Sequence, residues 1–184
     1  MNSHTIPTGK VDLVRIVRME KPHFEWPCKQ KNVTLRCILN DNLPEVKGDD
    51  DELAQVIRNL FGNAIKYTSP DTEIVVTVKI TSTLPKDPNF RNLKRAILFS
   101  VQDHGEGIPK EHLPRLTERF YRVDSARTRK VGGTGLGLAI VKHVLNRHHG
   151  ALVIDSIVGE GSTFSVYLPI YEDVERDSNK GEGI

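Results

Sequence analysis

The sequence predicts an α+β fold, in which a mixed, mostly antiparallel sheet packs on three main helices as a two-layer sandwich. Two long helical segments, 49–67 and 135–149, are each followed by a pair of alternating, β-branched segments that can form a hairpin. Helices that alternate with antiparallel hairpins do not fit a doubly wound parallel sheet. The 184 residues are enough for one domain with a sizeable core.

Each expected element follows from a local pattern. Residues 11–19 predict a strand that runs into a short helix, after which Pro22 and Pro27 break any regular pattern. Residues 41–47 predict a turn with a short extended piece, and residues 83–92 predict a polar loop. Strands are expected over 33–39, 73–80, 95–102, 151–157 and 163–168. Helices are expected over 49–67, 109–116 and 135–149.

Composition limits the class of protein. The chain divides into a tail or linker remnant (1–10), one domain (11–170) and an acidic tail (171–184) that is expected to be disordered. A net charge of +2 is too small to indicate that the chain binds nucleic acid or a membrane surface through its overall charge. Without an apolar run of ~20 residues or a signal peptide, we expect a cytoplasmic location, although a parent receptor could carry an inner-membrane anchor. Cys28 and Cys37 have no C-x-x-C partner, which disfavours zinc and leaves a disulfide unsupported.

One face of the helix 49–67 is polar and the opposite face is apolar. Such a polar face is most often plain solvated surface. However, Asn59 and Asn63 are costly inside a helix, and their amide oxygens can converge on a hard cation that bridges phosphates. Lys66 can reach a phosphate, and the ring of Tyr67 can cover a base. The polar residues of this face are Glu52, Gln55, Asn59, Asn63 and Lys66.

Asp103 ends the strand 95–102 on the same face as Ile97, Phe99 and Val101. If that face is the core, the carboxylate points into an apolar space and requires a donor, such as the amino group of adenine. The alternative, with equal weight, is that Asp103 lies beyond the strand and caps a turn.

Three glycines, Gly133, Gly135 and Gly137, lead into the helix 135–149, where backbone amides attract phosphate. Their G-x-G-x-G spacing matches neither a Rossmann loop nor a Walker loop, and a flexible turn is the plain alternative. The charged segment before them, about 117–134, is either a solvated loop or a lid that closes on a polyanion. Its charged residues include Glu118, Arg119, Arg122, Asp124, Arg127, Arg129 and Lys130.

Four motifs, in this order, resemble those of the GHKL ATP-binding family, and most of all its histidine-kinase branch. They are NLFGNAIKYT (N box), DHGEGI (G1 box), ERFYRVD (F box) and GGTGLGLAIVK (G2 box). GEGSTFSVYLP is similar to the closing strand pair of that family, and the resemblance covers about residues 10–170. The run that holds the F and G2 boxes is further similar to phosphate-regulon sensor kinases. The family implies ATP and Mg²⁺ as ligands and the Bergerat-type two-layer α/β sandwich as the fold.

The resemblance implies a role for each matching residue of the N box. Asn63 would ligate Mg²⁺, with support from Asn59. Lys66 would contact a phosphate, and Tyr67 would stack near the adenine.

Roles at the other motifs follow in the same way. Asp103 would accept a hydrogen bond from the adenine amino group, and Gly105 and Gly107 would shape the base pocket. Arg122 would reach the terminal phosphate, and Thr163 would help to hold the base end of the site. The hinge and phosphate-side wall of the lid would be formed by Gly133, Gly135 and Gly137. Further nucleotide-binding residues are expected at Ile108, Thr134, Leu136 and Leu138.

The resemblance also bears on the reaction. ATPase members of the family, such as DNA gyrase, carry a water-activating glutamate four residues before the metal-binding asparagine. This sequence has Asn59 there, and an amide cannot act as a general base. We therefore expect a pocket that holds MgATP without rapid hydrolysis and donates the γ-phosphoryl group.

The histidine that would accept this group is not expected in this chain. None of its seven histidines lies in an H-[DE]-L-R-[TS]-P-like box. The implied partners are the histidine-bearing dimerisation domain of a parent kinase and a downstream response regulator. Two alternatives stay open: a mechanical ATPase of the same family, and a nucleotide sensor or serine-directed kinase.

Overall fold

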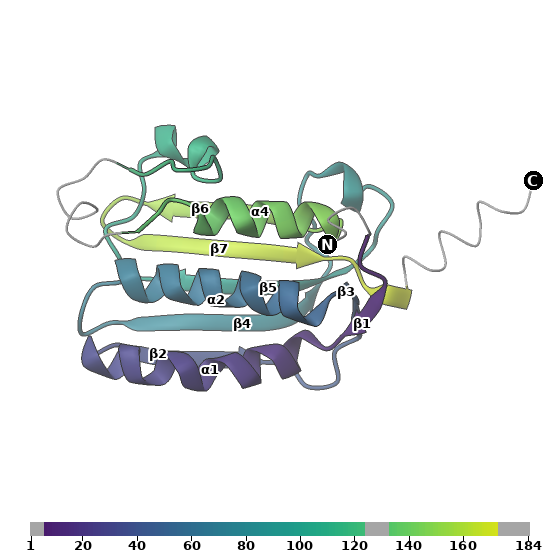
Figure 1. The fold of residues 1–184 in the computed structure, drawn as a ribbon, viewed down its shortest axis with the longest axis horizontal. Helices are drawn as coiled ribbons and strands as arrows, with labels where there is room; N and C mark the ends of the chain where they lie inside the picture. The colour runs from purple at the N-terminus through teal and green to yellow at the C-terminus, as the bar shows by residue number, and fades with distance from the viewer. Residues whose placement is uncertain (1–5, 124–132, 173–184) are drawn as a thin grey trace, which may run out of the picture.

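A computed structural model describes residues 6–123 and 133–172 (Figure 1). The strands are β1 (Gly9–Val11), β2 (Thr34–Leu39), β3 (Val46–Gly48), β4 (Glu73–Thr81), β5 (Ala96–Asp103), β6 (Ala151–Ile157) and β7 (Gly161–Leu168). The α-helices are α1 (Leu13–Gln30), α2 (Asp50–Tyr67) and α4 (Gly137–Arg147). Two short 3₁₀ helices are η1 (Pro88–Phe90) and η2 (Lys110–Arg115).

Five strands form one sheet in the order β2-β4-β5-β7-β6. β2 runs parallel to β4, and the other neighbours are antiparallel, so both predicted hairpins, β4–β5 and β6–β7, are present. α1, α2 and α4 lie side by side over one face of the sheet (Figure 1). β1 and β3 form a separate antiparallel pair at one end. The predicted two-layer α+β sandwich is therefore confirmed.

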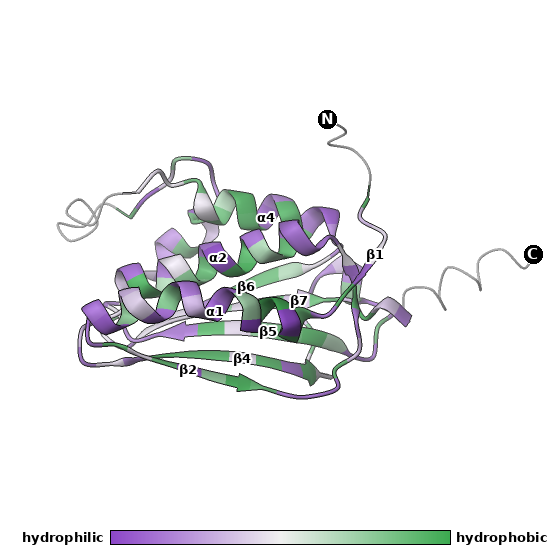
Figure 2. Ribbon diagram, turned by 60° about the horizontal axis from the view of Figure 1, so that its bottom comes forward, coloured by the Kyte–Doolittle hydropathy of each residue, from purple (hydrophilic) through white to green (hydrophobic). Residues whose placement is uncertain are grey.

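The core lies between the helix layer and the sheet. Figure 2 shows that the central strands are largely apolar, whereas apolar and polar residues alternate along the helices. The ring of Phe61 on α2 packs edge-on against Phe24 of α1, at 5.1 Å between centroids, and meets Phe99 of β5 at 6.2 Å. The predicted apolar face of α2 is buried throughout, at Leu53, Ile57, Leu60, Phe61 and Ala64.

The predicted strand that runs into a helix is present, but the predicted break at Pro22 and Pro27 is wrong. α1 continues as an 18-residue helix through Pro22 and Pro27, although each proline removes one helical hydrogen bond. Tertiary burial outweighs that loss, because one side of α1 covers the sheet. Asp12 caps the start of α1 by accepting a hydrogen bond from the Arg15 amide at 3.0 Å. The buried residues of α1 are Leu13, Val14, Ile16, Val17, Glu20 and Cys28.

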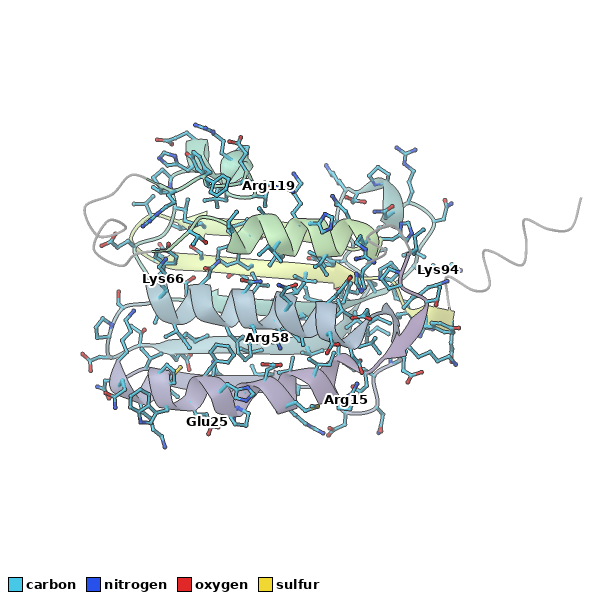
Figure 3. The ribbon with its side chains drawn as sticks, in the orientation of Figure 1. Arg15, Glu25, Arg58, Lys66, Lys94 and Arg119 are labelled. Carbon is cyan, nitrogen blue, oxygen red and sulfur yellow. The ribbon has the colours of Figure 1, made fainter. Side chains whose placement is uncertain are left out.

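A partly buried ion pair joins α1 to α2. Arg58 donates to the Glu20 carboxylate at 2.6 Å, and its side chain lies between the two helices (Figure 3). The side chain of Glu20 is only 10% exposed and that of Arg58 is 48% exposed, so the arginine offsets the cost of burying the carboxylate between the helices.

Other boundaries also differ from the predictions. β1 lies partly inside the segment 1–10 that was expected to be a tail, and the segment 83–92 contains η1, whose Phe90 is buried against Tyr167. The central part of the predicted lid (about 117–134), at 124–132, and nearly all of the acidic tail lie outside the described residues. Cys28 and Cys37 are free thiols. No helix in the described part of the chain is long and apolar enough to cross a membrane.

Candidate functional site

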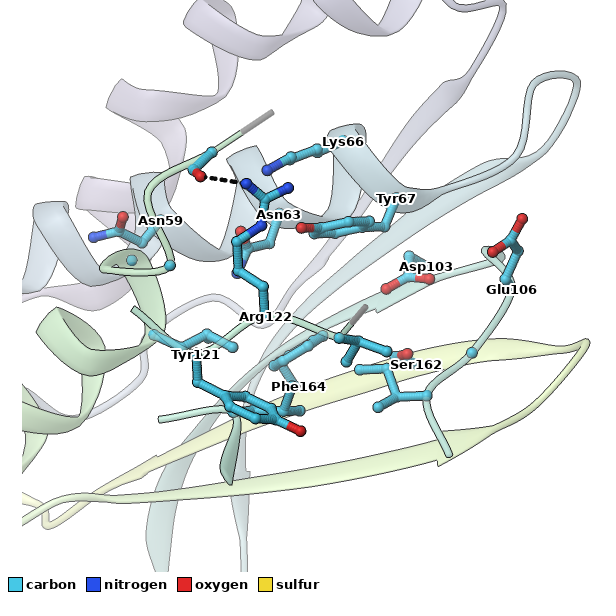
Figure 4. A pocket seen from close by; sticks show the side chains of 18 of the residues that line it. Asn59, Asn63, Lys66, Tyr67, Asp103, Glu106, Tyr121, Arg122, Ser162 and Phe164 are labelled. Carbon is cyan, nitrogen blue, oxygen red and sulfur yellow. Dashed lines mark hydrogen bonds between the residues drawn. The ribbon is translucent and has the colours of Figure 1, made fainter. Parts of the chain in front are cut away.

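The ends of four elements meet on one side of the molecule (Figure 1). They are the C-terminal ends of α2 and β5 and the N-terminal ends of β7 and α4. Between them lies a cavity of about 480 Å³, which Figure 4 shows from close by. Its described lining includes Asn59, Asn63, Lys66, Tyr67, Asp103, Glu106, Gly107, Ile108, Pro109, Leu116, Tyr121, Arg122, Val123, Gly133, Thr134, Gly135, Gly137, Leu138, Val158, Ser162 and Phe164.

α2 provides the polar wall of this cavity. Asn59, Asn63, Lys66 and Tyr67 follow one another along the helix (Figure 4). The Asn59 side-chain amide donates to the Gln55 carbonyl at 2.9 Å, which leaves its oxygen facing the start of α4. The Lys66 ammonium lies 5.0 Å from the centre of the Tyr67 ring. This wall therefore presents neutral amide oxygens and one cation.

A buried carboxylate lies at the other end of the cavity. Asp103 is only 4% exposed, on the core face of β5, and its Oδ1 accepts the Gly105 amide at 2.9 Å. Burial raises the pKa of Asp103, and hydrogen bonds from the Gly105 and Ser162 amides partly counter that effect. Both alternatives for this residue hold in part, because the carboxylate caps a turn and also faces the cavity.

The glycine segment closes the cavity opposite Asp103. Gly133 and Gly135 have φ values of +126° and +69°, a region that favours glycine. Arg122 donates to the Gly133 carbonyl at 2.7 Å (Figure 4), and the Lys66 ammonium lies directly against Gly133. Leu136 precedes α4 and makes no side-chain cap bond among the described residues. Two cations and the backbone amides of a helix start therefore converge on one end of the cavity.

Residues 48–172 match the model of a protein family described as the histidine kinase-, DNA gyrase B- and HSP90-like ATPases. The chain belongs to this ATPase family. The match spans the N, G1, F and G2 boxes together with the closing strand pair, so the resemblance noted in the sequence is confirmed.

Relatives of this ATPase-family chain are sensor kinases. It is 47% identical to the phosphate regulon sensor protein PhoR of Pseudomonas aeruginosa over 67% of its own length and 25% of that relative. It is 36% identical to the sensor histidine kinase WalK of Bacillus subtilis, over 91% of its length and 26% of WalK. The chain thus spans about a quarter of each relative. The mycobacterial sensor histidine kinase MprB has a similar solved structure, with a TM-score of 0.69, 26% identity and coverage of 88% and 98% of the two chains.

Most of the residues predicted for the site line the cavity, but three do not. Thr163 lies on the opposite face of β7 from its neighbours Ser162 and Phe164, because successive side chains of a strand alternate. Gly105 does not reach the cavity, because its Cα is packed against the backbone carbonyl of Tyr67. Leu136 only precedes the first turn of α4. At this position of β7 it is therefore Ser162, paired with Asp103 of β5, that lines the cavity.

Several lining residues were missed in the sequence. Ser162 and Phe164 could have been found by counting alternate positions back from Val166 and Leu168, which face the core. Tyr121 had no periodic signal, since it lies in an irregular segment. The remaining missed residues are Glu106, Pro109, Leu116, Val123 and Val158.

Tyr121 is held in the cavity wall from outside. Its hydroxyl is hydrogen-bonded to Nδ1 of His112 at 2.6 Å, and the Arg115 guanidinium lies 4.2 Å from its ring centre. His112 and Arg115 both belong to η2, so this short helix fixes one wall of the site.

Proposed function

We propose that this chain is the MgATP-binding catalytic domain of a longer, two-component sensor histidine kinase. It would donate the γ-phosphoryl group of ATP to a histidine on a separate dimerisation domain, which passes the signal to a response regulator. The similarity to PhoR supports a kinase of the phosphate-regulon type. In the parent protein this domain would lie in the cytoplasm. The observation that carries the proposal is one cavity with a buried acceptor at one end and converging cations at the other.

The two ends of the cavity orient a nucleotide. Asp103 offers a carboxylate to the adenine amino group, and the ring of Tyr67 lies nearby as a stacking surface (Figure 4). Lys66, Arg122 and the start of α4 are placed for the phosphates. A cavity of about 480 Å³ is within the size range of small-molecule sites.

The amide pair on α2 fits magnesium. Mg²⁺ retains several waters and takes few protein ligands when it bridges phosphates, and it prefers oxygen donors. Asn63 would be the direct ligand, and Asn59, with its amide nitrogen engaged by Gln55, would present its oxygen beside it. No cluster of three or more His, Cys, Asp or Glu side chains suited to a metal occurs among the described residues, so a metal site here would depend on the nucleotide. Held there by Asn63, a magnesium ion would supply charge neutralisation at the phosphates.

The distribution of carboxylates favours transfer over hydrolysis. Among the described lining residues, the carboxylates are Asp103 and Glu106, and both lie at the base end (Figure 4). The position of the catalytic glutamate in gyrase-type ATPases is Asn59. No described lining residue at the phosphate end carries a carboxylate that could activate water, and Arg122 would stabilise the phosphoryl group on its way to an incoming imidazole.

The substitution Asn63→Ala tests this proposal. We expect it to abolish the Mg²⁺-dependent part of the affinity for AMP-PNP, measured by calorimetry with and without the metal. Asn146→Ala, at an exposed asparagine of α4, is the matched control and should leave binding unchanged. Unchanged affinity of the Asn63 variant in the presence of Mg²⁺ would count against the proposal.

An experiment with ATP labelled in its γ-phosphate distinguishes the proposal from its alternatives. With a candidate dimerisation domain added, we expect an acid-labile phosphohistidine on that domain and little release of free phosphate. Rapid steady-state hydrolysis by the chain alone would instead indicate a mechanical ATPase. An acid-stable phosphoserine would indicate a serine-directed kinase, and no label at all a nucleotide sensor.

A further inference from the structure

The last turn of α2 lacks two of its usual hydrogen-bond donors. In a continuing helix the carbonyls of Ile65 and Lys66 would accept the amides of residues 69 and 70. The Ser69 amide instead donates to the His104 carbonyl at 3.1 Å. Pro70 has no amide proton to donate. Both carbonyls therefore need donors from elsewhere in the molecule.

Lys31 supplies these donors from another helix. Its ammonium donates to the Ile65 carbonyl at 2.7 Å and to the Lys66 carbonyl at 3.0 Å, in a partly buried position. Lys31 is the residue that caps the C-terminal end of α1. A positive charge at the negative end of the α2 dipole is also electrostatically favourable. Lys31 lies outside the four motifs and outside the family match at 48–172.

The turn that Lys31 holds carries part of the nucleotide site. Lys66 and Tyr67 both line the cavity, and the Tyr67 carbonyl packs directly on Gly105. Thr68, which is fully buried, accepts the His104 amide through its hydroxyl at 3.2 Å. Through these contacts the end of α2 is joined to the turn that begins at Asp103.

The charge of Lys31 also acts on the base end. It is among the groups that lower the pKa of Asp103 against the effect of burial, together with His104 and the two backbone amides. An ionised carboxylate offers only acceptors, which suits the donor amino group of adenine.

We propose that Lys31 is a positioning residue of the nucleotide site, which fixes Tyr67 and Asp103 in the geometry that selects adenine. The inference rests on the proposed nucleotide-binding function. Lys31 itself does not line the cavity, so its effect passes through the last turn of α2. The plain alternative is that Lys31 only stabilises the helix end and has no bearing on which base is bound.

Lys31→Met, Lys31→Arg and the control Lys29→Met test the inference in the full chain. Methionine keeps much of the apolar stem but removes the donors and the charge, whereas arginine keeps both. Lys29 is an exposed lysine in the same last turn of α1. The affinities for AMP-PNP and GMP-PNP are measured by calorimetry, at a temperature where circular dichroism shows each variant folded.

We expect Lys31→Met to weaken AMP-PNP binding about tenfold and to reduce the preference for AMP-PNP over GMP-PNP by a similar factor. Lys31→Arg should restore most of both, and Lys29→Met should match the wild type. If Lys31→Met does not fold, Lys31→Gln, which keeps an amide donor, should show a smaller loss of the same preference.

Two results would overturn the inference while the proposed function stands. One is a folded Lys31→Met or Lys31→Gln variant with wild-type affinity and selectivity. The other is an equal loss for both nucleotides, which would indicate a purely structural role. A wild-type chain that binds neither nucleotide would overturn the proposed function and the inference with it.

Discussion

Replacing Asp103 by asparagine should change nucleotide affinity and protein stability in opposite directions. The carboxylate is almost fully buried on the core face of β5, and burial is the main cause of its raised pKa. Asparagine has nearly the same shape and can still accept the Gly105 amide through its oxygen. The substitution therefore removes the charge while it keeps the turn.

The sign of the stability effect follows from proton binding. Because the pKa in the folded state lies above the ordinary value of 3.8, the folded chain binds a proton at Asp103 more readily than the unfolded chain does. The contribution of Asp103 to stability is thus full below pH 3.8 and is lost as the pH rises through the folded-state pKa. At pH 7 the ionised group disfavours folding, so Asp103→Asn should raise the free energy of unfolding there.

The effect on binding has the other sign. A hydrogen bond from the adenine amino group to a charged acceptor contributes about 1.5–3 kcal/mol, which corresponds to roughly 10- to 150-fold in affinity. Calorimetry with AMP-PNP and Mg²⁺ at pH 7 measures this loss. Urea unfolding without nucleotide, at pH 5 and pH 7.5, measures the gain in stability. Glu106→Gln, at an exposed carboxylate of the same cavity, is the control and should change affinity little. A variant that is both less stable at pH 7 and unimpaired in binding would refute the reasoning.

Two further predictions concern packing and pH. Gly105→Ala would place a methyl group against the Tyr67 carbonyl, and we expect a loss of about 1–3 kcal/mol in the free energy of unfolding and at least tenfold weaker AMP-PNP binding. Gly62→Ala, in open space on α2, should instead add about 0.5–1 kcal/mol, and a destabilised control would contradict this. Burial lowers the pKa of His148, so its contribution to stability is present above pH 6.5 and lost as the pH falls through the folded-state pKa. In urea unfolding between pH 8 and 5, His148→Gln should weaken the change of the free energy of unfolding with pH. If that change with pH is the same as in the wild type, another group causes it.

The helix α2 was predictable from the sequence because one segment carries two independent patterns. Its apolar face has the helical period, and Asp49 caps its first turn by accepting the Glu52 amide at 2.9 Å. Strand alternation likewise predicts that Asp103 shares a face with Ile97, Phe99 and Val101, and all four residues are buried. Both are local rules that need no knowledge of the partners.

The failures have a common physical origin in tertiary contacts. Local propensity ends a helix at Pro22, but in the fold α1 gains more from covering the sheet than it loses in two hydrogen bonds. Tyr121 lines the site because His112 and Arg115 of η2 hold it there, and such contacts cannot be predicted from the spacing of residues in the sequence. Lys31 is separated from the carbonyls it serves by more than thirty residues, so only the folded chain reveals its partners.

His148 joins the two helices of the site at the ends remote from the cavity. α2 and α4 run antiparallel, and Nε2 of His148, after the last turn of α4, accepts the Asp49 amide at 3.1 Å. The Arg147–Glu52 ion pair, at 2.5 Å, lies at the same end. A rotation of α4 about this attachment therefore moves its start most. Over eleven residues, or about 16 Å, a tilt of about 10° shifts Gly137 by about 3 Å. A small tilt of α4 about His148 would therefore change the distance between the start of α4 and the phosphates of a nucleotide bound as proposed.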